Sequence, residues 1–176
     1  MRWVAMLRGV NVGGTTVSMV DLRRALAAAG LGEVTTYRQS GNVIASSDLD
    51  ATGVEDAVAT SVAEVSGHDV AVVARSADEL GTVVAVNPLS ARSVDPTRLH
   101  VTFLRHPPAP GRLGSLTLPP TGDEMVVVER EVYLHCPGGY GRTPLTTGWI
   151  ERSLGVVATT RNWRTVTRLA ELAAGA

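Results

Sequence analysis

The chain has 176 residues, with 16 basic and 17 acidic side chains and a formal net charge of -1. Every basic side chain is an arginine, which excludes chemistry that needs a lysine, such as a Schiff base or the phosphate contact of a P-loop. The single cysteine, Cys136, excludes an intrachain disulfide and a zinc site built from several cysteines.

The first half of the chain alternates between strand-like and helix-like patterns. A continuous apolar run at 3–7 is typical of a buried strand. Ser18 followed by Asp21 resembles a capping box that opens a helix, and Gly30 supplies its stop. The order of elements predicts a ferredoxin-like βαββαβ unit. The expected elements are a strand at 3–7, a helix at 18–29, strands at 33–37 and 43–45, a helix at 51–66 and a strand at 70–74.

The second half repeats this order. A short helix is expected at 77–86, and prolines and small residues at 87–96 indicate a linker. The strand at 3–7 does not alternate apolar and polar residues, so both its faces need cover, and the second half is the candidate. We therefore predict an α+β fold of two tandem ferredoxin-like βαββαβ halves packed together, plus a C-terminal helix, with subdomains at 1–90 and 91–176. The later elements expected are a strand at 99–103, a weak helix at 110–116, strands at 125–128 and 132–136, a helix at 147–154, a short strand at 156–157 and a last helix at 162–174.

The net charge hides an uneven distribution. Residues 1–47 contain five arginines against two acidic residues, and residues 132–176 again contain five against two. Residues 48–131 contain six arginines against thirteen acidic residues. This distribution suggests an anion-facing region built from both ends of the chain. The alternative is ordinary scatter of surface charge.

A glycine-rich loop between the first strand and the first helix is a candidate anion site. Gly9, Gly13 and Gly14 let backbone N–H groups turn inward, and the following helix adds positive potential at its N-terminus. Arg8 would complete the site with a bidentate fork. The spacing matches neither the P-loop nor the dinucleotide-binding motif. The alternative is a tight turn with positive φ, in which Asn11 bonds to nearby backbone.

Two further polar loops are candidates for the same site. Arg38, Gln39, Ser40 and Asn42 form a predicted hairpin tip. Turn formation accounts for Asn42 but not for Arg38 and Gln39, which need only be solvated. Arg142 lies in a second glycine-rich loop that leads into a helix, and a flexible connection is its alternative reading.

The last predicted helix carries several arginines. Asn162 is expected to cap it. Arg161, Arg164 and Arg168 follow at positions i, i+3 and i+7, and such a face suits a phosphate chain or a carboxylate ligand. The alternative is a solvated face on which Arg168 pairs with Glu171.

The sequence offers little for metal binding or covalent catalysis. His68, His100, His106 and His135 lack the spacing of metal ligands. His135 and Cys136 are neighbours on a predicted strand and point to opposite faces, so they do not form a simple nucleophile pair. We therefore predict no metal and no cofactor, and we assign no catalytic residue.

Three ordered sequence blocks carry a family resemblance. They comprise residues 8–14 with 22–23 and 37–43, residues 133–134 with 141–142, and residues 160–166. Together they resemble the family called domain of unknown function 1697. The resemblance implies a small bacterial-type cytoplasmic protein with two α+β subdomains, and it implies no established activity, substrate, cofactor or catalytic residue.

The chain departs from this family's pattern at two places. Relatives often carry lysine soon after the glycine pair, where this chain has Thr15 and Thr16, and serine with a basic residue after the second loop, where it has Thr143 and Pro144. A ligand held by those lysines would be bound here less tightly or through arginine. The alternative is that the lysines of the relatives are ordinary surface residues that bind no ligand.

The charge distribution and the polar motifs favour a non-catalytic binding protein for a small anionic ligand, such as a nucleotide, a phosphate or a nucleic-acid end, at a site between the halves. The alternatives are an enzyme on a phosphorylated or carboxylated metabolite, and a structural or interaction protein without a ligand. A pI of 6.4 argues against binding of double-stranded nucleic acid, and no apolar run is long enough for a membrane span. A single thiol without an export signal indicates a cytoplasmic location. The oligomeric state stays open. The predicted site residues are Arg8, Gly9, Asn11, Gly13, Gly14, Arg38, Gln39, Ser40, Asn42, Arg142, Arg161, Asn162 and Arg164.

Overall fold

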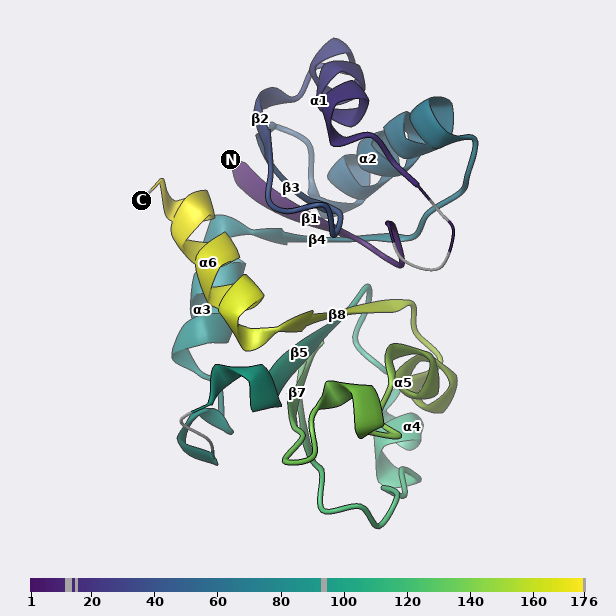
Figure 1. Ribbon diagram of the computed structural model, residues 1–176, viewed down its shortest axis with the longest axis vertical. Coiled ribbons are helices and arrows are strands. Elements are labelled where there is room, and N and C mark those ends of the chain that lie inside the picture. Colours follow the sequence, from purple (N-terminus) through teal and green to yellow (C-terminus); the bar gives the residue numbers. More distant parts are fainter. Residues whose placement is uncertain (12–13, 15, 93–94, 176) are drawn as a thin grey trace. The chain divides into compact units, whose positions relative to one another are not determined.

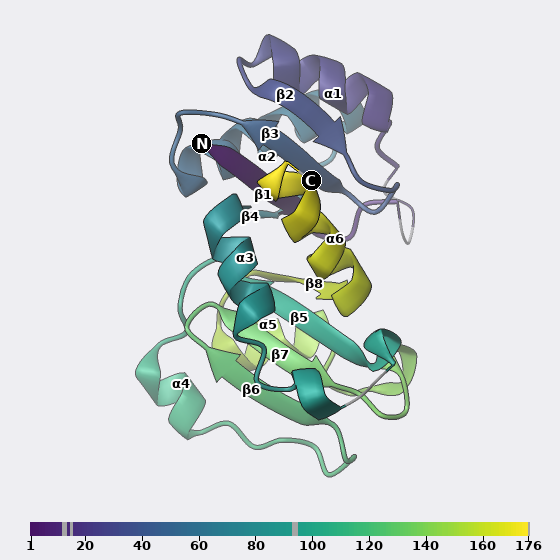
Figure 2. The ribbon, with the colours of Figure 1, turned by 90° about the vertical axis from the view of Figure 1, so that its left-hand side faces the viewer.

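The computed structural model describes residues 1–11, 14, 16–92 and 95–175. These residues form a mixed α+β fold with two four-stranded antiparallel sheets and six helices (Figures 1 and 2). The chain divides into two compact units: unit 1 comprises 1–82 and the chain from Arg168 onward, and unit 2 comprises Val83–Thr167. No helix in the described ranges is long and apolar enough to cross a membrane.

Unit 1 has strands in the spatial order β2-β3-β1-β4, with every neighbouring pair antiparallel. Helices α1 and α2 cover one face of this sheet (Figure 1). Because β3 is the neighbour of β1, the turn between β2 and β3 lies beside the loop that follows β1. The elements are β1 (Arg2–Leu7), α1 (Met19–Ala28), β2 (Gly32–Thr36), β3 (Asn42–Ser46), α2 (Ala51–Ser66) and β4 (Val72–Ser76).

Alternate residues of the strands and one stripe of each helix make the core of unit 1. Trp3, Ala5 and Leu7 of β1 pack with buried leucines of α1 and valines of α2. The helix ends follow the sequence signals, since the Ser18 hydroxyl accepts from the Asp21 N–H at 3.3 Å. Gly67 ends α2 in the left-handed conformation, with φ of 71°.

Unit 2 repeats the strand and helix order, with its sheet arranged β6-β7-β5-β8, again antiparallel throughout. Buried residues of β5, β7 and α5 form its core around Leu104, Leu134 and Ile150. The elements are α3 (Ala77–Ala85), which begins in unit 1, then η1 (Ser90–Arg92), η2 (Pro96–Arg98), β5 (Leu99–Leu104), α4 (Pro110–Gly114), β6 (Glu124–Val128), β7 (Glu131–His135), η3 (Tyr140–Arg142), α5 (Thr147–Leu154), β8 (Ala158–Asn162) and α6 (Trp163–Ala174), which ends in unit 1.

One predicted element was placed wrongly. The last strand spans Ala158–Asn162 and not 156–157. The β-branched Thr160 pairs with Thr102 of β5, and this register places Arg161 opposite Val101. Arg161 is therefore a strand residue and does not share a helical face with the arginines of α6. The mixed α+β class is confirmed, whereas the ferredoxin-like βαββαβ arrangement, the subdomain boundaries and the packing of the halves on each other stay predictions.

Candidate functional site

Asn11 connects three separate segments of unit 1. Its Nδ2 atom donates to the Gln39 carbonyl at 2.6 Å and to the Val17 carbonyl at 3.3 Å, and its Oδ1 accepts from the Val17 N–H at 2.9 Å. Asn11 has φ of 54°, a left-handed conformation that asparagine tolerates better than most residues. The side chain thus fixes the β1–α1 loop, the entry to α1 and the hairpin tip to one another.

The hairpin tip is locked against the end of β1. Gly41 has φ of 69°, and its carbonyl accepts from the Leu7 N–H at 2.8 Å. The buried Asn42 side chain donates to the Tyr37 carbonyl at 3.2 Å and to the Ser40 hydroxyl at 3.0 Å. Gly41, Asn42 and Ser40 therefore serve the turn, and the exposed tip residues Arg38 and Gln39 are the ones presented outward.

A groove of about 420 Å³ lies between this tip and the start of α1. The Arg23 guanidinium donates to the Thr36 hydroxyl at 2.7 Å, and the Cζ atom of Arg38 lies 5.4 Å from the centroid of the Tyr37 ring. No lining residue is acidic, and in the described part of the chain no carboxylate pairs with Arg23 or Arg38. The groove is therefore electropositive. It is lined by Ser18, Met19, Val20, Arg23, Thr36, Arg38 and Gln39.

The structure brings only some of the predicted loop residues to this groove. Arg38 and Gln39 line it, and Asn11 holds it together from behind. Arg8 is exposed next to β1, with its N–H bonded to the Ala71 carbonyl at 2.9 Å, and it is not a lining residue. Gly9 and Gly14 have positive φ values of 69° and 110°, which fits the tight-turn alternative. Gly13 lies outside the described residues.

Arg23 was missed as a site residue by the sequence reasoning. It follows Met19 by four residues, so both lie on the same side of α1, and this side faces the end of β2. The available signal was an arginine one turn after a helix cap. Only the pairing of β2 with β3 determines that Thr36 and Arg38 stand opposite it.

Replacing Asn11 tests its role in positioning the hairpin tip. We expect Asn11→Gly to lower the free energy of unfolding by about 1–2 kcal/mol, because three hydrogen bonds are lost while glycine keeps the positive φ without strain. Asn11→Ala should cost about 1 kcal/mol more, from the left-handed backbone. Urea denaturation measures both. If Asn11→Gly is as stable as the unsubstituted protein, these bonds do not hold the site.

Two of the four predicted site residues in unit 2, Arg161 and Asn162, have structural tasks of their own. Arg161 donates to the Thr159 hydroxyl at 2.7 Å and to the Thr160 carbonyl at 3.0 Å, and burial lowers its pKa to about 10. The Asn162 side chain accepts from the Thr165 N–H at 2.9 Å, which confirms that it caps α6. Arg142 and Arg164 are exposed. The convergence of these residues with those of unit 1 stays a prediction.

A chain of hydroxyl groups links β5 and β8 of the second sheet to the start of α5 and to η3. The Thr160 hydroxyl lies 2.7 Å from those of Thr102 and Thr147, and the Thr147 hydroxyl lies 3.2 Å from that of Tyr140. The Tyr140 ring stacks on His100, with centroids 4.5 Å apart. Burial lowers the pKa of His100 to about 4, although a hydrogen bond with the Arg98 backbone opposes this. His100 is thus a neutral core residue.

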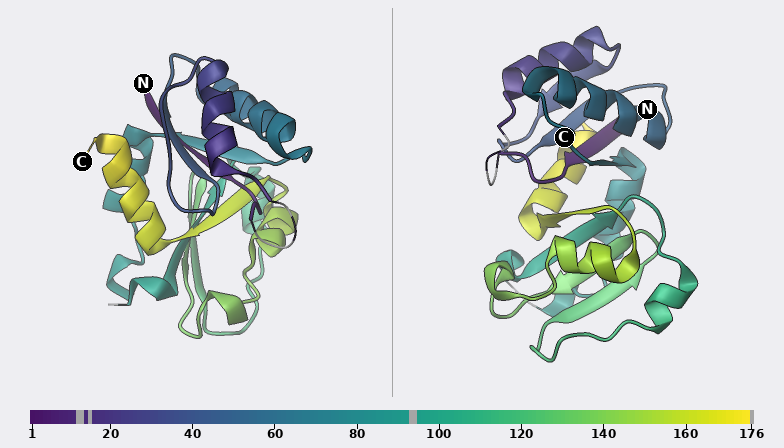
Figure 3. Two further views of the ribbon diagram at one scale, coloured as in Figure 1. Left: turned by 45° about the horizontal axis from the view of Figure 1, so that its top comes forward. Right: turned by 90° about the vertical axis from the view of Figure 1, so that its right-hand side faces the viewer.

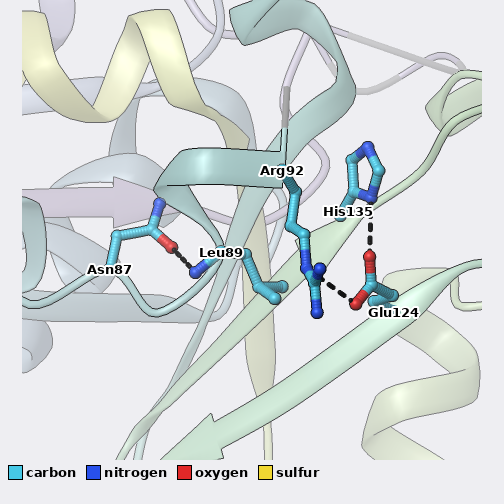
Figure 4. Close-up of polar contacts among 5 residues, drawn as sticks. All are labelled: Asn87, Leu89, Arg92, Glu124 and His135. Atoms are coloured by element: carbon cyan, nitrogen blue, oxygen red, sulfur yellow. Dashed lines mark hydrogen bonds and ion pairs between the residues drawn. The ribbon is translucent and has the colours of Figure 1, made fainter. Parts of the chain in front are cut away.

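A second polar cluster fastens the connection between α3 and β5. The Glu124 carboxylate lies 3.1 Å from Arg92 Nε and 3.0 Å from His135 Nδ1, and the Asn87 side chain accepts from the Leu89 N–H at 2.9 Å (Figure 4). The ion pair with Arg92 is partly exposed and worth little by itself. The cluster orients the connection and presents no open coordination geometry.

Metal and nucleophile chemistry find no support in this geometry. Across residues 1–11, 14, 16–92 and 95–175, no group of three His, Cys, Asp or Glu side chains is placed to hold a metal ion. Cys136 is fully buried, and this burial raises the pKa of its thiol against the opposing effect of a bond to Thr143. A buried thiol with a raised pKa is a poor nucleophile.

Comparisons with known proteins give relatives whose descriptions name no activity. Residues 1–133 match the family described as "Protein of unknown function (DUF1697)". The solved structure of a conserved bacterial protein from Streptococcus pneumoniae is similar, with a TM-score of 0.74, 20% sequence identity and coverage of 98% of both chains. No curated protein matches. At this identity the structural similarity supports the fold alone.

Proposed function

The chain belongs to the family Protein of unknown function (DUF1697), whose description names no activity, and we propose that this member binds a small anionic ligand without catalysing a reaction. The ligand class is a phosphate-bearing molecule of the size of a nucleotide or smaller. The observation that carries the proposal is the groove beside α1, which holds two arginines and no acidic residue.

Three features of the groove favour an anion. The Arg23 guanidinium is already oriented by Thr36, so less conformational freedom is lost when it meets a ligand. Arg38 adds a second fork from the opposite side. The N-terminus of α1 contributes positive potential at the Ser18 end, although Asp21, paired with Arg24 at 3.4 Å, cancels part of it.

The same lining favours binding over catalysis. None of its seven residues is His, Asp, Glu or Cys, so the groove supplies no group that exchanges protons near neutral pH. Arginine forks and hydroxyl groups recognise an oxyanion by geometry and charge. An enzyme acting on the same ligand class would need a titratable side chain within hydrogen-bond reach.

We also infer a ferredoxin-like arrangement for each unit. The order βαββαβ and the sheet order β2-β3-β1-β4, matched by β6-β7-β5-β8, support this inference. In such an arrangement the helices lie on one face of the sheet and the loops after the first and second strands lie at one end. The groove of unit 1 is at that end.

Arg38→Ala tests the binding proposal directly. We expect it to weaken the binding of pyrophosphate and of AMP at least about tenfold, because one charge-assisted fork is lost, and Arg23→Ala to act in the same direction. Isothermal titration calorimetry on the full chain measures both. Arg24→Ala is the matched control, since Arg24 lies on the same helix outside the groove and should change affinity less than about twofold.

Two results would contradict this proposal. One is that neither anion binds the unsubstituted protein, which would favour a structural or interaction protein. The other is that Arg24→Ala weakens binding as much as Arg38→Ala, which would reduce the effect to general surface charge.

A further inference from the structure

A second pocket lies wholly within unit 2, at the C-terminal end of α5. The groove of unit 1, by contrast, lies at the N-terminal end of α1. The volume of the second pocket is about 590 Å³, within the range of small-molecule sites. The Arg105 N–H donates to the Val157 carbonyl at 2.9 Å, which joins the segments that follow β5 and precede β8. Gly155 ends α5 in the left-handed conformation, with φ of 70°. The pocket is lined by Arg105, His106, Pro107, Ala109, Arg112, Leu154, Gly155, Val156 and Val157.

The ionisable side chains that line this pocket are all basic. Arg105, His106 and Arg112 contribute to it, and none of the nine lining residues is acidic. The Arg112 guanidinium lies beside Gly155, since its Cζ atom is 3.8 Å from the position that a Cβ on Gly155 would occupy, an ordinary van der Waals distance. Among the described residues, no group accepts a hydrogen bond from the exposed Arg112 guanidinium or pairs with it.

The C-terminal pole of α5 explains only part of this arrangement. Its partial negative charge attracts one cation, and Arg112 lies beside it. It does not account for the exposed His106 that lines the same pocket, and an oxyanion there has to be held by side chains, because the helix pole itself repels it. The α4 and α5 segments that frame the pocket come from different parts of the chain (Figures 1 and 3), so the grouping is produced by the fold.

The rest of the lining is apolar. Leu154 is buried at the base of α5, and Val157 is 40% exposed, which is high for a valine next to a sheet. Pro107, Ala109 and Val156 complete an apolar wall beside the basic side chains. A ligand that satisfies both parts carries an oxyanion at one end and a short hydrocarbon group at the other.

We propose that this pocket of unit 2 binds a small amphipathic oxyanion, a carboxylate or phosphate attached to an aliphatic chain of a few carbons. Arg112 forms the principal fork, and Leu154 with Val156 and Val157 contacts the chain. The pocket shares no residue with the groove of unit 1. Its occupancy is therefore independent of the phosphate binding proposed there, and either can fail alone.

The test uses the full chain and three probes: hexanoate, hexanol and inorganic phosphate. In NMR titrations on protein labelled with ¹⁵N, hexanoate should shift the Gly155 amide and the Arg112 Nε–H signals. Hexanol should bind at least about tenfold more weakly because it cannot engage the fork. Inorganic phosphate should also bind more weakly because it leaves the apolar wall in water.

Arg112→Ala and Arg152→Ala separate the fork from general charge. Arg112→Ala should weaken hexanoate binding about tenfold and leave the fold intact, since Arg112 is exposed. Arg152, exposed on α5 outside the pocket, should change the affinity less than about twofold when replaced by alanine. Equal affinity for hexanol, or unchanged hexanoate binding in Arg112→Ala, would overturn the proposal. Tighter binding of phosphate than of hexanoate would overturn its apolar part.

Discussion

Gly41→Ala is expected to lower the free energy of unfolding by about 3 kcal/mol, the sum of a backbone cost and a steric cost. Gly41 has φ of 69°, a conformation that costs an alanine about 1–2 kcal/mol. A Cβ at this position would stand 2.9 Å from Leu7 Cβ and would overlap the Val10 side chain, and both neighbours are buried and cannot easily move aside. Urea denaturation of the full chain measures the loss.

Gly9→Ala is the matched control for this prediction. Gly9 has the same φ of 69°, yet a Cβ there would meet nothing within 4 Å. Only the backbone cost remains, so we expect a loss of about 1–2 kcal/mol. If the two substitutions lower the free energy of unfolding equally, the close approach of the hairpin tip to β1 adds no steric cost to Gly41→Ala. Because this approach presents Arg38 to the groove, Gly41→Ala should also weaken pyrophosphate binding in the fraction that stays folded.

The stability of the protein should fall as the pH is lowered from about 7 to about 4, and His100 should account for about 3 kcal/mol of the fall. The pKa of His100 is about 4 in the folded chain, against an ordinary value of 6.5. Between these values the unfolded chain binds a proton that the folded chain does not, so protonation favours unfolding. The contribution is fully present above pH 6.5 and is lost progressively toward pH 4.

His100→Phe isolates this contribution. Phenylalanine keeps an aromatic ring against Tyr140 and removes the titrating group, and it also removes a buried Nδ1 atom that has no hydrogen-bond partner in the described part of the chain. The free energy of unfolding should still fall between pH 7 and pH 4 in the variant, but the fall should be about 3 kcal/mol smaller than in the unsubstituted protein. An unchanged pH dependence would show that His100 is protonated without penalty in the folded protein.

Local signals in the sequence were reliable wherever neighbours in the chain decide the structure. Ser18 caps α1 through the Asp21 N–H, and α2 spans the predicted 51–66 and ends at Gly67. The pairing of Arg168 with Glu171, which was the alternative to a ligand-binding face, is also present, at 2.7 Å. Caps, positive-φ glycines and i,i+3 pairs are short-range features, so the residues that form them are visible together in the sequence.

Only some of the residues of the candidate sites could be predicted from such short-range features. Arg38, Gln39 and Asn11 carried a signal, because polar residues at a hairpin tip and in a glycine loop exceed what a turn needs. Arg23 looked like any solvated helix arginine, and Arg112 like any residue of a weak helix. Their partners, Thr36 and Gly155, lie 13 and 43 residues away along the chain.

The sequence by itself determined most of the elements, their order and the chemistry available. With arginine as the only strong base, anion recognition must come from guanidinium forks and backbone amides. The tertiary structure decided which residues meet. The register of β8 on β5 made Arg161 a strand residue, and the pairing of β3 with β1 placed the hairpin tip against the loop after β1. Strand order and register depend on how side chains pack that are distant from one another in the sequence. Periodicity within one segment therefore does not determine them.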